Sequence, residues 1–279
     1  MRIPPRITQV GAVALLAAAT VLTLAVLVFI VVFVLQRGIP VVGWRFLFDN
    51  PEDMGKAGGI FPTLVASIVL PLLAVLVALP LGLGTAVYLT EYTRETRITR
   101  IIRFGTDCLA GIPSIIFGLF GFIFFVIVLR MGWSLLSGGL TLALMILPTI
   151  IRTSEEAIKA VPNAYREVSF SLGASRWRTI VKVVLPNALP GILTGVMLGI
   201  GRSIGETAAV IFTAGSSLRM PHTVFDSART MSVHFFYLAT EGISPENAYG
   251  TAAVLILSVL LVNAVAYWLM HRFMAQKHA

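Results

Sequence analysis

The chain has 279 residues, of which 57% are hydrophobic and only 12% are charged, and its net charge is +8. Soluble domains carry roughly 25% charged residues, so the composition excludes an ordinary soluble domain and predicts a protein surrounded largely by lipid. The basic residues lie in short segments between apolar runs, a pattern that argues against nucleic acid as the partner and for a membrane.

Six apolar runs approach or exceed the roughly 20 residues that a membrane-spanning helix needs. They are, in chain order, Val10–Leu35, Ile60–Thr90, Leu109–Leu129, Trp133–Ile151, Ala188–Ala214 and Ala248–Met270. The first run exceeds the roughly 7–15 residues of a signal-peptide core, and we interpret it as a retained signal anchor. The expected fold class is therefore an all-α integral membrane protein with six transmembrane helices.

Basic residues concentrate on one side of these runs. They are dense in residues 2–6, 94–103, 152–182 and 272–277, and sparser in the alternate segments. The positive-inside rule places the richer side in the cytoplasm, so both termini are expected there. We divide the chain into residues 1–59, a signal-anchor span with the first periplasmic loop, and residues 60–279, a transmembrane domain with a cytoplasmic loop over 152–187.

The residues that usually carry catalysis or metal binding show no such pattern here. Cys108 is the one thiol, so it has no partner for an internal disulfide, and we expect it to be a small apolar packing residue. No Gly-x-x-x-x-Gly-Lys-Ser/Thr phosphate loop is present. Solvated roles are expected for the four histidines, which are His222, His234, His271 and His278. We expect no catalytic residue, cofactor or metal, and a membrane enzyme is disfavoured.

The loop between the fourth and fifth spans predicts a helix–turn–helix. Asn163 is expected to cap a helix over 164–172, and Gly173 to end that helix in the left-handed conformation. Ser175 is expected to cap a second helix over 176–184, which the following proline ends. Such a rigid hairpin suits either the surface of another protein or anionic lipid headgroups, and the residues alone leave both interpretations open.

This loop resembles the EAA loop of ABC-importer permeases. The residues that match its spacing are Glu167, Gly173, Val183, Leu185 and Pro186. Small residues, Val168 and Ser169, replace the two alanines that name the motif. In that family the loop docks in a groove of the ATP-binding subunit. The resemblance therefore implies that an ATPase is coupled through Glu167, Ser169, Gly173, Ala174 and Ser175.

The fifth apolar run carries two opposite charges, Arg202 and Glu206. At 1.5 Å per residue Arg202 lies roughly 20 Å into the span, where an isolated charge costs at least about 2.5–3.5 kcal/mol on insertion scales. A helix would place the two residues on one face, where they form either a structural ion pair or a site for an oxyanion. The neighbouring hydroxyls of Ser203 and Thr207 are further candidate donors.

Three sequence segments narrow the resemblance from ABC-importer permeases in general to one type of permease. Gly201–Ala208, Ala110–Gly121 and the stretch Leu185–Gly195 are similar to PstA-type permeases of bacterial phosphate ABC importers, over roughly residues 60–214. The resemblance implies the type I ABC importer permease fold in a prokaryotic inner membrane. It implies that Arg202 and Glu206 act in phosphate passage, and Ser114 is a candidate lining residue. Implied partners are a PstC-type permease, a PstB-type ATPase dimer and an external PstS-type phosphate-binding protein, with lipid around the spans.

Two other functions stay open at this stage. A permease for another oxyanion, such as phosphonate, sulfate or molybdate, would also use Arg202. A channel or secondary transporter would work without ATP and leaves the EAA-type loop unexplained. The expectation is therefore a permease subunit that forms half of a phosphate pathway, with ATP hydrolysis on a separate subunit.

Overall fold

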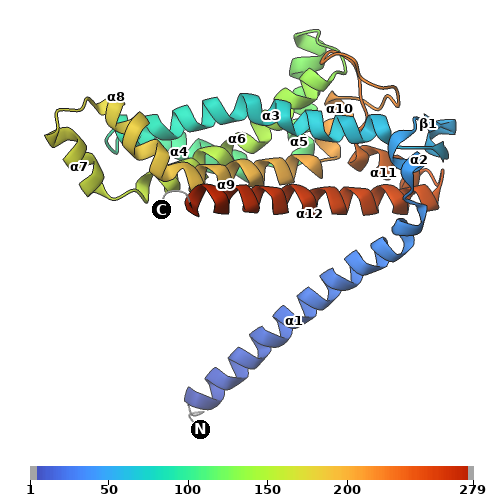
Figure 1. The fold of residues 1–279 in the computed structure, drawn as a ribbon, viewed down its shortest axis with the longest axis horizontal. Helices are drawn as coiled ribbons and strands as arrows, with labels where there is room; N and C mark the ends of the chain where they lie inside the picture. Colours follow the sequence, from blue (N-terminus) through green and yellow to red (C-terminus); the bar gives the residue numbers. More distant parts are fainter. Residues whose placement is uncertain (1–4, 276–279) are drawn as a thin grey trace.

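The computed structural model describes residues 5–275, with side chains from 9 to 268, and is mostly helical (Figure 1). Five helices of this part are long and apolar enough to cross a membrane, and a bent pair makes a sixth candidate. The five contain α1 (Pro5–Gly38), α3 (Phe61–Val87), α6 (Leu135–Lys159), α9 (Leu185–Ile204) and α12 (Pro245–Ala275). The prediction of an all-helical membrane protein is confirmed, and its six spans are recovered when the bent pair counts as one.

The centre of the bundle is the contact of α3 with α6, flanked by α9. Small residues of α3, such as Ala66 and Ala74, are fully buried, and larger side chains of α6, such as Leu142 and Ile146, fill the space against them. Between lipid-embedded helices association depends on close packing rather than on the hydrophobic effect, and small residues permit that approach. The core therefore lies between α3, α6 and α10 (Ala208–Thr213).

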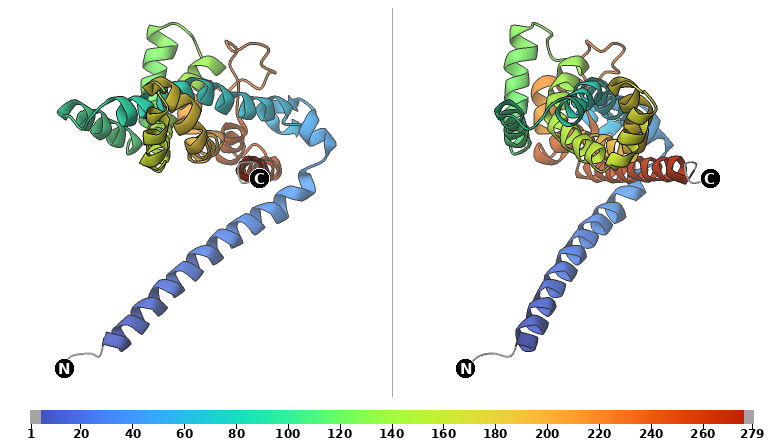
Figure 2. Two further views of the ribbon diagram at one scale, coloured as in Figure 1. Left: turned by 60° about the vertical axis from the view of Figure 1, so that its left-hand side comes forward. Right: turned by 90° about the vertical axis from the view of Figure 1, so that its left-hand side faces the viewer.

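Helix α1 stands away from this bundle, as all three ribbon views show (Figures 1 and 2). It touches α12 only near its own C-terminal end, where Gly38 packs directly against Tyr249. The guanidinium carbon of Arg37 lies 4.7 Å from the ring centre of Phe33 and 5.4 Å from that of Tyr249. Of the side chains described in α1, from Gln9 onward, most other apolar ones are exposed, and Val31, Val34 and Leu35 are half-buried.

The third predicted span, 109–129, is wrong as a continuous helix. Helix α4 (Arg97–Ala110) ends at the first residue of the Ala110–Gly121 string, and the next helical segment, α5 (Ser114–Gly121) with the π-helical η4 (Phe122–Val128), is bent from α4 by 101°. The break falls at Gly111–Pro113, because Pro113 lacks the N–H that would continue α4 and disfavours helix at the preceding residue. The segment 94–103, expected as a loop, is therefore partly helical.

The boundaries of the fourth and fifth spans also differ from the prediction. Helix α6 continues past Ile151 to Lys159. Helix α9 stops at Ile204, and residues 205–207 separate it from α10, so the predicted continuous span to Ala214 is wrong.

The short elements gather mostly at the two ends of the bundle (Figure 1). One end carries η1 (Ile39–Val41), α2 (Trp44–Phe48), η2 (Asp53–Gly55), α11 (Met231–Thr240) and a small antiparallel sheet of β1 (Pro51–Glu52) and β2 (Ala57–Gly58). The other end carries η3 (Tyr88–Tyr92), α7 (Asn163–Ser171), α8 (Arg176–Thr179) and η5 (Ile180–Val184).

Two single-residue expectations are overturned. Cys108, expected as a packing residue, is exposed because it lies on the outward face of α4. His234, expected to be solvated, is only 1% exposed because α11 packs its first turns against α3 and α12. His271 lies where no side chain is described, and His278 lies outside the described residues.

Candidate functional site

The predicted helix–turn–helix exists as a hairpin of α7 and α8, residues 163–179 (Figure 1). Gly173 has φ +77°, so the predicted left-handed turn is confirmed. The predicted cap at Ser175 is confirmed, because its Oγ accepts a hydrogen bond from the Arg178 N–H at 3.4 Å. The predicted cap at Asn163 is wrong: Pro162 precedes the helix, and Asn163 is its first residue.

The sequence predicted that Pro186 ends the second helix of the hairpin, and this prediction is wrong. Helical structure runs without a break from Arg176 to Ile204 and includes the π-helical turn η5 just before Pro186. A proline removes one backbone donor and crowds the preceding turn, and a π-helical turn is a common way to accommodate such a defect. The hairpin is therefore rigidly continuous with the helix that carries Arg202.

A buried contact joins the two arms of the hairpin. The hydroxyl oxygens of Ser169 and Thr179 lie 2.8 Å apart and are both enclosed. Ser169, which the EAA-type pattern marked as a coupling residue, therefore lies inside the hairpin, whereas Glu167 and Ser175 are exposed and Ala174 is half-buried.

Arg166 ties the hairpin to two other helices. Its Nε and Nη2 donate to one carboxylate oxygen of Glu91, in η3, at 3.0 and 2.7 Å. Nη1 also donates to the Val161 carbonyl at 2.7 Å, and Nη2 to the Ile158 carbonyl at 3.0 Å, at the end of α6. The side chains of Arg166 and Glu91 are only 14% and 10% exposed. Sequence reasoning missed this pair, since nothing local links residues 75 apart.

The outer surface of the hairpin carries a row of exposed apolar side chains beside exposed charged ones. Tyr165, Val168 and Leu172 recur at helical spacing on α7 and are at least half exposed, with Leu172 83% exposed, and Trp177 on α8 is also exposed. A contiguous exposed apolar group of this kind marks a contact with another molecule.

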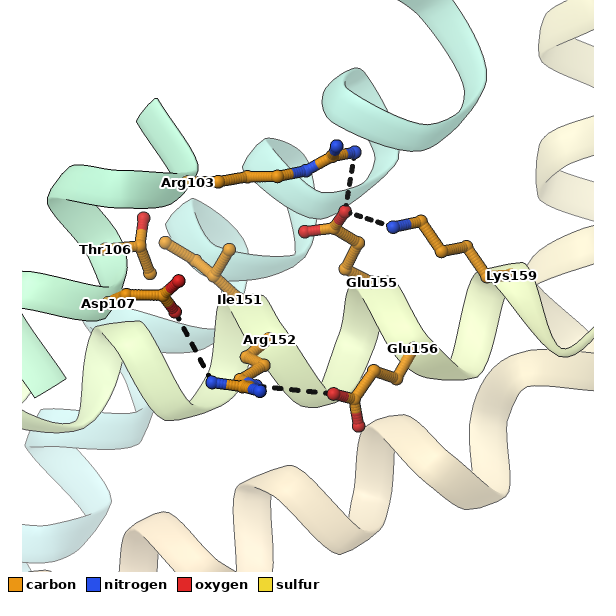
Figure 3. A pocket seen from close by; sticks show the side chains of 8 residues that line it. All are labelled: Arg103, Thr106, Asp107, Ile151, Arg152, Glu155, Glu156 and Lys159. Atoms are coloured by element: carbon orange, nitrogen blue, oxygen red, sulfur yellow. Dashed lines mark hydrogen bonds and ion pairs between the residues drawn. The ribbon is translucent and has the colours of Figure 1, made fainter. Parts of the chain in front are cut away.

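A charged cavity of about 200 Å³ lies where α4 meets α6 (Figure 3). One oxygen of the buried Glu155 accepts from Arg103 Nη2 at 2.7 Å and from Lys159 Nζ at 2.6 Å. Arg152 forms looser, exposed pairs with Asp107 at 3.4 Å and Glu156 at 3.3 Å. Acidic and basic side chains here compensate one another, so the cluster holds α4 against α6 rather than offering a free charge.

The structure separates Arg202 from Glu206. Arg202 lies in the last turn of α9 and is exposed, whereas Glu206 lies in the break at 205–207. The predicted pairing on one helix face is wrong, because the helix ends between them, and no ion pair within 4.0 Å joins these two described residues. Glu206 instead accepts a hydrogen bond from the Ala209 N–H at 3.3 Å, at the start of α10.

The remaining predicted residues lie at the two breaks, Ser203 and Thr207 at 205–207 and Ser114 just after 111–113. Ser203 Oγ is buried and has no hydrogen-bond partner among the described residues. Thr207 is half-buried, and its hydroxyl makes only a long contact, 3.5 Å, with the Gly205 carbonyl. Ser114 is the first residue of α5 and is half-buried.

Helices α5 and α10 run side by side in the same direction. A Cβ on Gly118 would meet Ala208 and Ala209, and one on Gly121 would meet Thr213. The second turn of α5 therefore lies level with the first turn of α10, and Ser114 lies about one helical turn, roughly 5 Å, before that level. The fold thus brings together the broken ends of two spans, one with Ser114 and one with Glu206, near an arginine that has no acidic partner in the described chain.

Within the described residues, no group of three or more His, Cys, Asp and Glu side chains is arranged to hold a metal ion.

Comparisons with known proteins match nearly the whole chain. A family model described as the inner membrane component of binding-protein-dependent transport systems matches residues 78–276. The chain is 33% identical over 280 residues to a probable ABC transporter permease protein, YqgI of Bacillus subtilis, covering 95% of each chain. It is 36% identical over 232 residues to the phosphate transport system permease protein PstA 1 of Mycobacterium tuberculosis, covering 81% of this chain and 74% of the relative. A PstA of Pasteurella multocida is 33% identical, with 83% of each chain covered.

Solved structures share the fold at low identity. A bacterial ABC transporter involved in the import of the acidic polysaccharide alginate has a chain with a TM-score of 0.71 and 14% identity, covering 96% of this chain and 97% of its own. A chain of the MetNI methionine ABC transporter has a TM-score of 0.61 and 18% identity, covering 77% of this chain and 94% of its own.

Proposed function

Because the chain belongs to the family of binding-protein-dependent transport system inner membrane components, we propose that it is the permease subunit of an ATP-driven importer of inorganic phosphate. Family membership makes it an ABC importer permease and a multi-pass protein of the inner membrane, with the type I importer fold predicted from sequence. Phosphate as the substrate is the proposal. It is supported by relatives named as phosphate permeases at 31–36% identity over most of the chain.

The single observation that carries the proposal is that Arg202 has no acidic partner among the described residues. Its guanidinium lies at the broken end of a span and has no acidic partner in the described chain, while the carboxylate of Glu206 is engaged with the start of α10. An uncompensated charge inside a membrane segment faces a partner or an aqueous path rather than lipid. The planar fork of arginine donates two parallel hydrogen bonds to one oxyanion.

The other residues around the break have supporting roles in this proposal. Thr207 at the break and Ser114 at the start of α5 are proposed as further hydroxyl donors, as is the buried Ser203 Oγ, which has no hydrogen bond to a described residue. Glu206 holds the start of α10 and so keeps the break open. In the proposal, phosphate passes between this chain and a PstC-type permease, because one chain alone makes only half of the pathway.

The α7–α8 hairpin is proposed to receive the force from a PstB-type ATPase dimer. Exposed Tyr165, Val168 and Leu172, with Glu167 beside them, form the surface for that contact. Ser169, Gly173, Ala174 and Ser175 maintain the shape of the hairpin. Because helical structure is continuous from α8 to α9, a movement of the hairpin is transmitted to Arg202. An apolar docking face and an uninterrupted helical connection favour a protein partner over lipid headgroups.

Several assignments from sequence belong to the same proposal. The hairpin end and both termini are proposed to face the cytoplasm, residues 1–59 to form a signal anchor with the first outer loop, and residues 60–279 to form the transport domain. ATP hydrolysis is proposed to reside on the partner ATPase, and phosphate to be delivered by a PstS-type binding protein.

The test is uptake of labelled phosphate into vesicles that hold this chain with its candidate partners. We expect uptake that requires ATP, is competed by phosphate but not sulfate, and falls at least tenfold in Arg202→Ala, with partial activity in Arg202→Lys. Lys56→Ala, which removes an exposed cation outside the spans, is the matched control. Uptake without ATP would instead indicate a channel or secondary transporter. ATP-dependent uptake of sulfate, phosphonate or molybdate would replace the substrate and keep the permease.

A further inference from the structure

A second cavity lies away from the Arg202 break, beside the loop that follows α10, and its lining is mostly apolar with three serines on one side. It has a volume of about 520 Å³ and lies between α5–η4, α10 and residues 215–227. One wall is aromatic and includes Trp133 and Tyr237, and the other carries the hydroxyls of Ser216, Ser217 and Ser227. We call it the serine cavity. At roughly 30 Å³ per water molecule, it holds a tetrahedral anion with part of its hydration shell.

Helix α10 and the loop after it, which line the serine cavity, lie away from the α7–α8 hairpin in the bundle (Figure 1). Helix α10, Ala208–Thr213, connects the break at 205–207 with Gly215 at the cavity wall. Six residues at 1.5 Å each make this distance about 9 Å along the helix axis. An anion in the cavity is therefore separated from the break next to Arg202 by the length of α10.

Arg229 places a positive charge directly behind the wall of the cavity. Its Nε donates to the Ser216 carbonyl at 2.9 Å, and its guanidinium carbon lies 4.6 Å from the centre of the Tyr237 ring. Both Ser216 and Tyr237 line the cavity. The residue is only 8% exposed. Burial lowers the pKa of Arg229 from its ordinary value, but a guanidinium stays charged at any physiological pH.

Within the described chain Arg229 forms no close ion pair, although against the effect of burial the charge of Glu241 acts on it from beyond 4.0 Å and raises its pKa. No acidic group lies within 4.0 Å of Arg229 there. Its two terminal amino groups make no hydrogen bond with described residues and are not among the enclosed unpaired atoms, so they reach solvent. The nearby acid of the loop, Asp226, accepts from the N–H groups of His222 and Thr223 at 2.8 and 2.7 Å. Burial keeps neighbouring His234 neutral, with its pKa lowered to about 4.

The hydroxyls of Ser216 and Ser217 are available as donors and their backbone is held in place, whereas Ser227 Oγ already donates to the Ala214 carbonyl at 3.0 Å. Ser217 Oγ accepts from the Arg219 N–H at 3.3 Å, which leaves its proton free, and Ser216 Oγ has no hydrogen bond to a described residue. The loop is anchored at both ends, because Ala228 N donates to the Ala214 carbonyl at 3.1 Å and Leu136 N to the Val224 carbonyl at 2.8 Å. Donors fixed before binding lose little entropy on meeting an anion.

We propose that the serine cavity is a binding site for a tetrahedral oxyanion, held by the hydroxyls of Ser216 and Ser217 and by the charge of Arg229, and that it receives the anion before the Arg202 level. The identity of the anion as phosphate rests on the proposed function; the site itself does not.

The test uses a cysteine as a reporter of charge in the assembled transporter. In a Cys108→Ser background, Ser217→Cys is modified with an anionic and with a cationic methanethiosulfonate of similar size. We expect the anionic reagent to react faster. The positive charge of Arg229 attracts the anionic reagent and repels the cationic one. Arg229→Gln should therefore lower the ratio of the anionic to the cationic reaction rate about tenfold. Lys56→Gln is the control and should leave the ratio within about twofold.

Protection by anions then separates the site from the identity of its ligand. Millimolar phosphate, but not sulfate, should slow the modification of Ser217→Cys. Protection by sulfate, phosphonate or molybdate without protection by phosphate would support the site and overturn phosphate as the substrate. Equal rates for the two reagents, or no protection by any oxyanion, would overturn the site.

A second variant leaves Arg229 in place, because replacing this buried residue could itself disturb the loop. Ser216→Ala removes a hydroxyl that bonds to no described residue, so the loop should fold as before. A hydrogen bond to a charged ligand is lost, and we expect the KM for uptake to rise about tenfold with kcat unchanged. An unchanged KM would contradict a role of Ser216 in binding.

Discussion

Replacing Glu91 with glutamine removes the carboxylate beneath Arg166 and should loosen the α7–α8 hairpin from the end of α3. In the native protein one oxygen of Glu91 accepts from Nε at 3.0 Å and from Nη2 at 2.7 Å, and both side chains are nearly buried. Hydrogen bonds to charged groups contribute about 1.5–3 kcal/mol. The amide of the Glu91→Gln variant would retain an oxygen acceptor, and Arg166 would retain its two backbone carbonyls, so we expect a loss of about 2 kcal/mol.

That loss corresponds to roughly a 30-fold shift from the seated to the loosened hairpin. Because the proposed function routes ATP-driven movement through this hairpin, we expect more ATP hydrolysed per phosphate imported, measured in the reconstituted transporter. Hydrogen exchange of residues 163–171 should speed up in parallel. The matched control is Arg152→Gln, whose ion pairs are exposed and worth less than about 1 kcal/mol.

The result that refutes this reasoning is a Glu91→Gln protein with unchanged exchange in α7 and an unchanged ratio of hydrolysis to uptake. An equal fall in hydrolysis and uptake, with the ratio preserved, would also refute it, because hydrolysis and movement would then still be linked.

Three further predictions concern the hairpin, the break and α11. Ser169→Ala should leave the buried Thr179 hydroxyl unpaired and lower stability by about 1–3 kcal/mol; thermal unfolding in detergent should show Ser169→Ala with Thr179→Val costing less than the two single changes summed. Glu206→Gln, which keeps the acceptor for Ala209 N–H, should retain more uptake than Glu206→Ala if the role is structural; equal losses would point to the charge instead. His234 has its pKa lowered to about 4 by burial, so the unfolded state binds the extra proton as pH falls below about 6.5. Its share of stability is complete above that pH and is lost towards pH 4, and His234→Leu should flatten this part of an unfolding-against-pH curve.

Local chemistry explains which parts of the hairpin could be predicted. The left-handed turn at Gly173 and the cap at Ser175 depend on neighbouring residues only, and both are present. The end of the second helix at Pro186 was predicted by the same reasoning and is wrong, because the π-helical turn of η5 precedes the proline and helical structure continues. The local preference of the backbone is to end a helix near a proline, and packing of the helix against α6 overrides that preference.

In the candidate site, too, local sequence features predicted which charged residues matter but not how they are arranged. Arg202 and Glu206 could be recognised from their place in an apolar run, but their separation could not be predicted, because hydropathy carries no sign that the helix ends at Ile204. Nothing near Arg166 in the chain indicated Glu91, and nothing near Arg229 indicated that it backs a cavity.

The sequence by itself determined the class of protein, because lipid requires long apolar helices and leaves charge only in short segments, and these properties can be read one segment at a time. It also determined the turn of the hairpin, whose geometry a single glycine permits. Only the tertiary structure decided where two spans break, which arginine is compensated and which is free, and which serines share a cavity. These features depend on distances between residues far apart in the chain, and a distance of this kind exists only once the helices have packed.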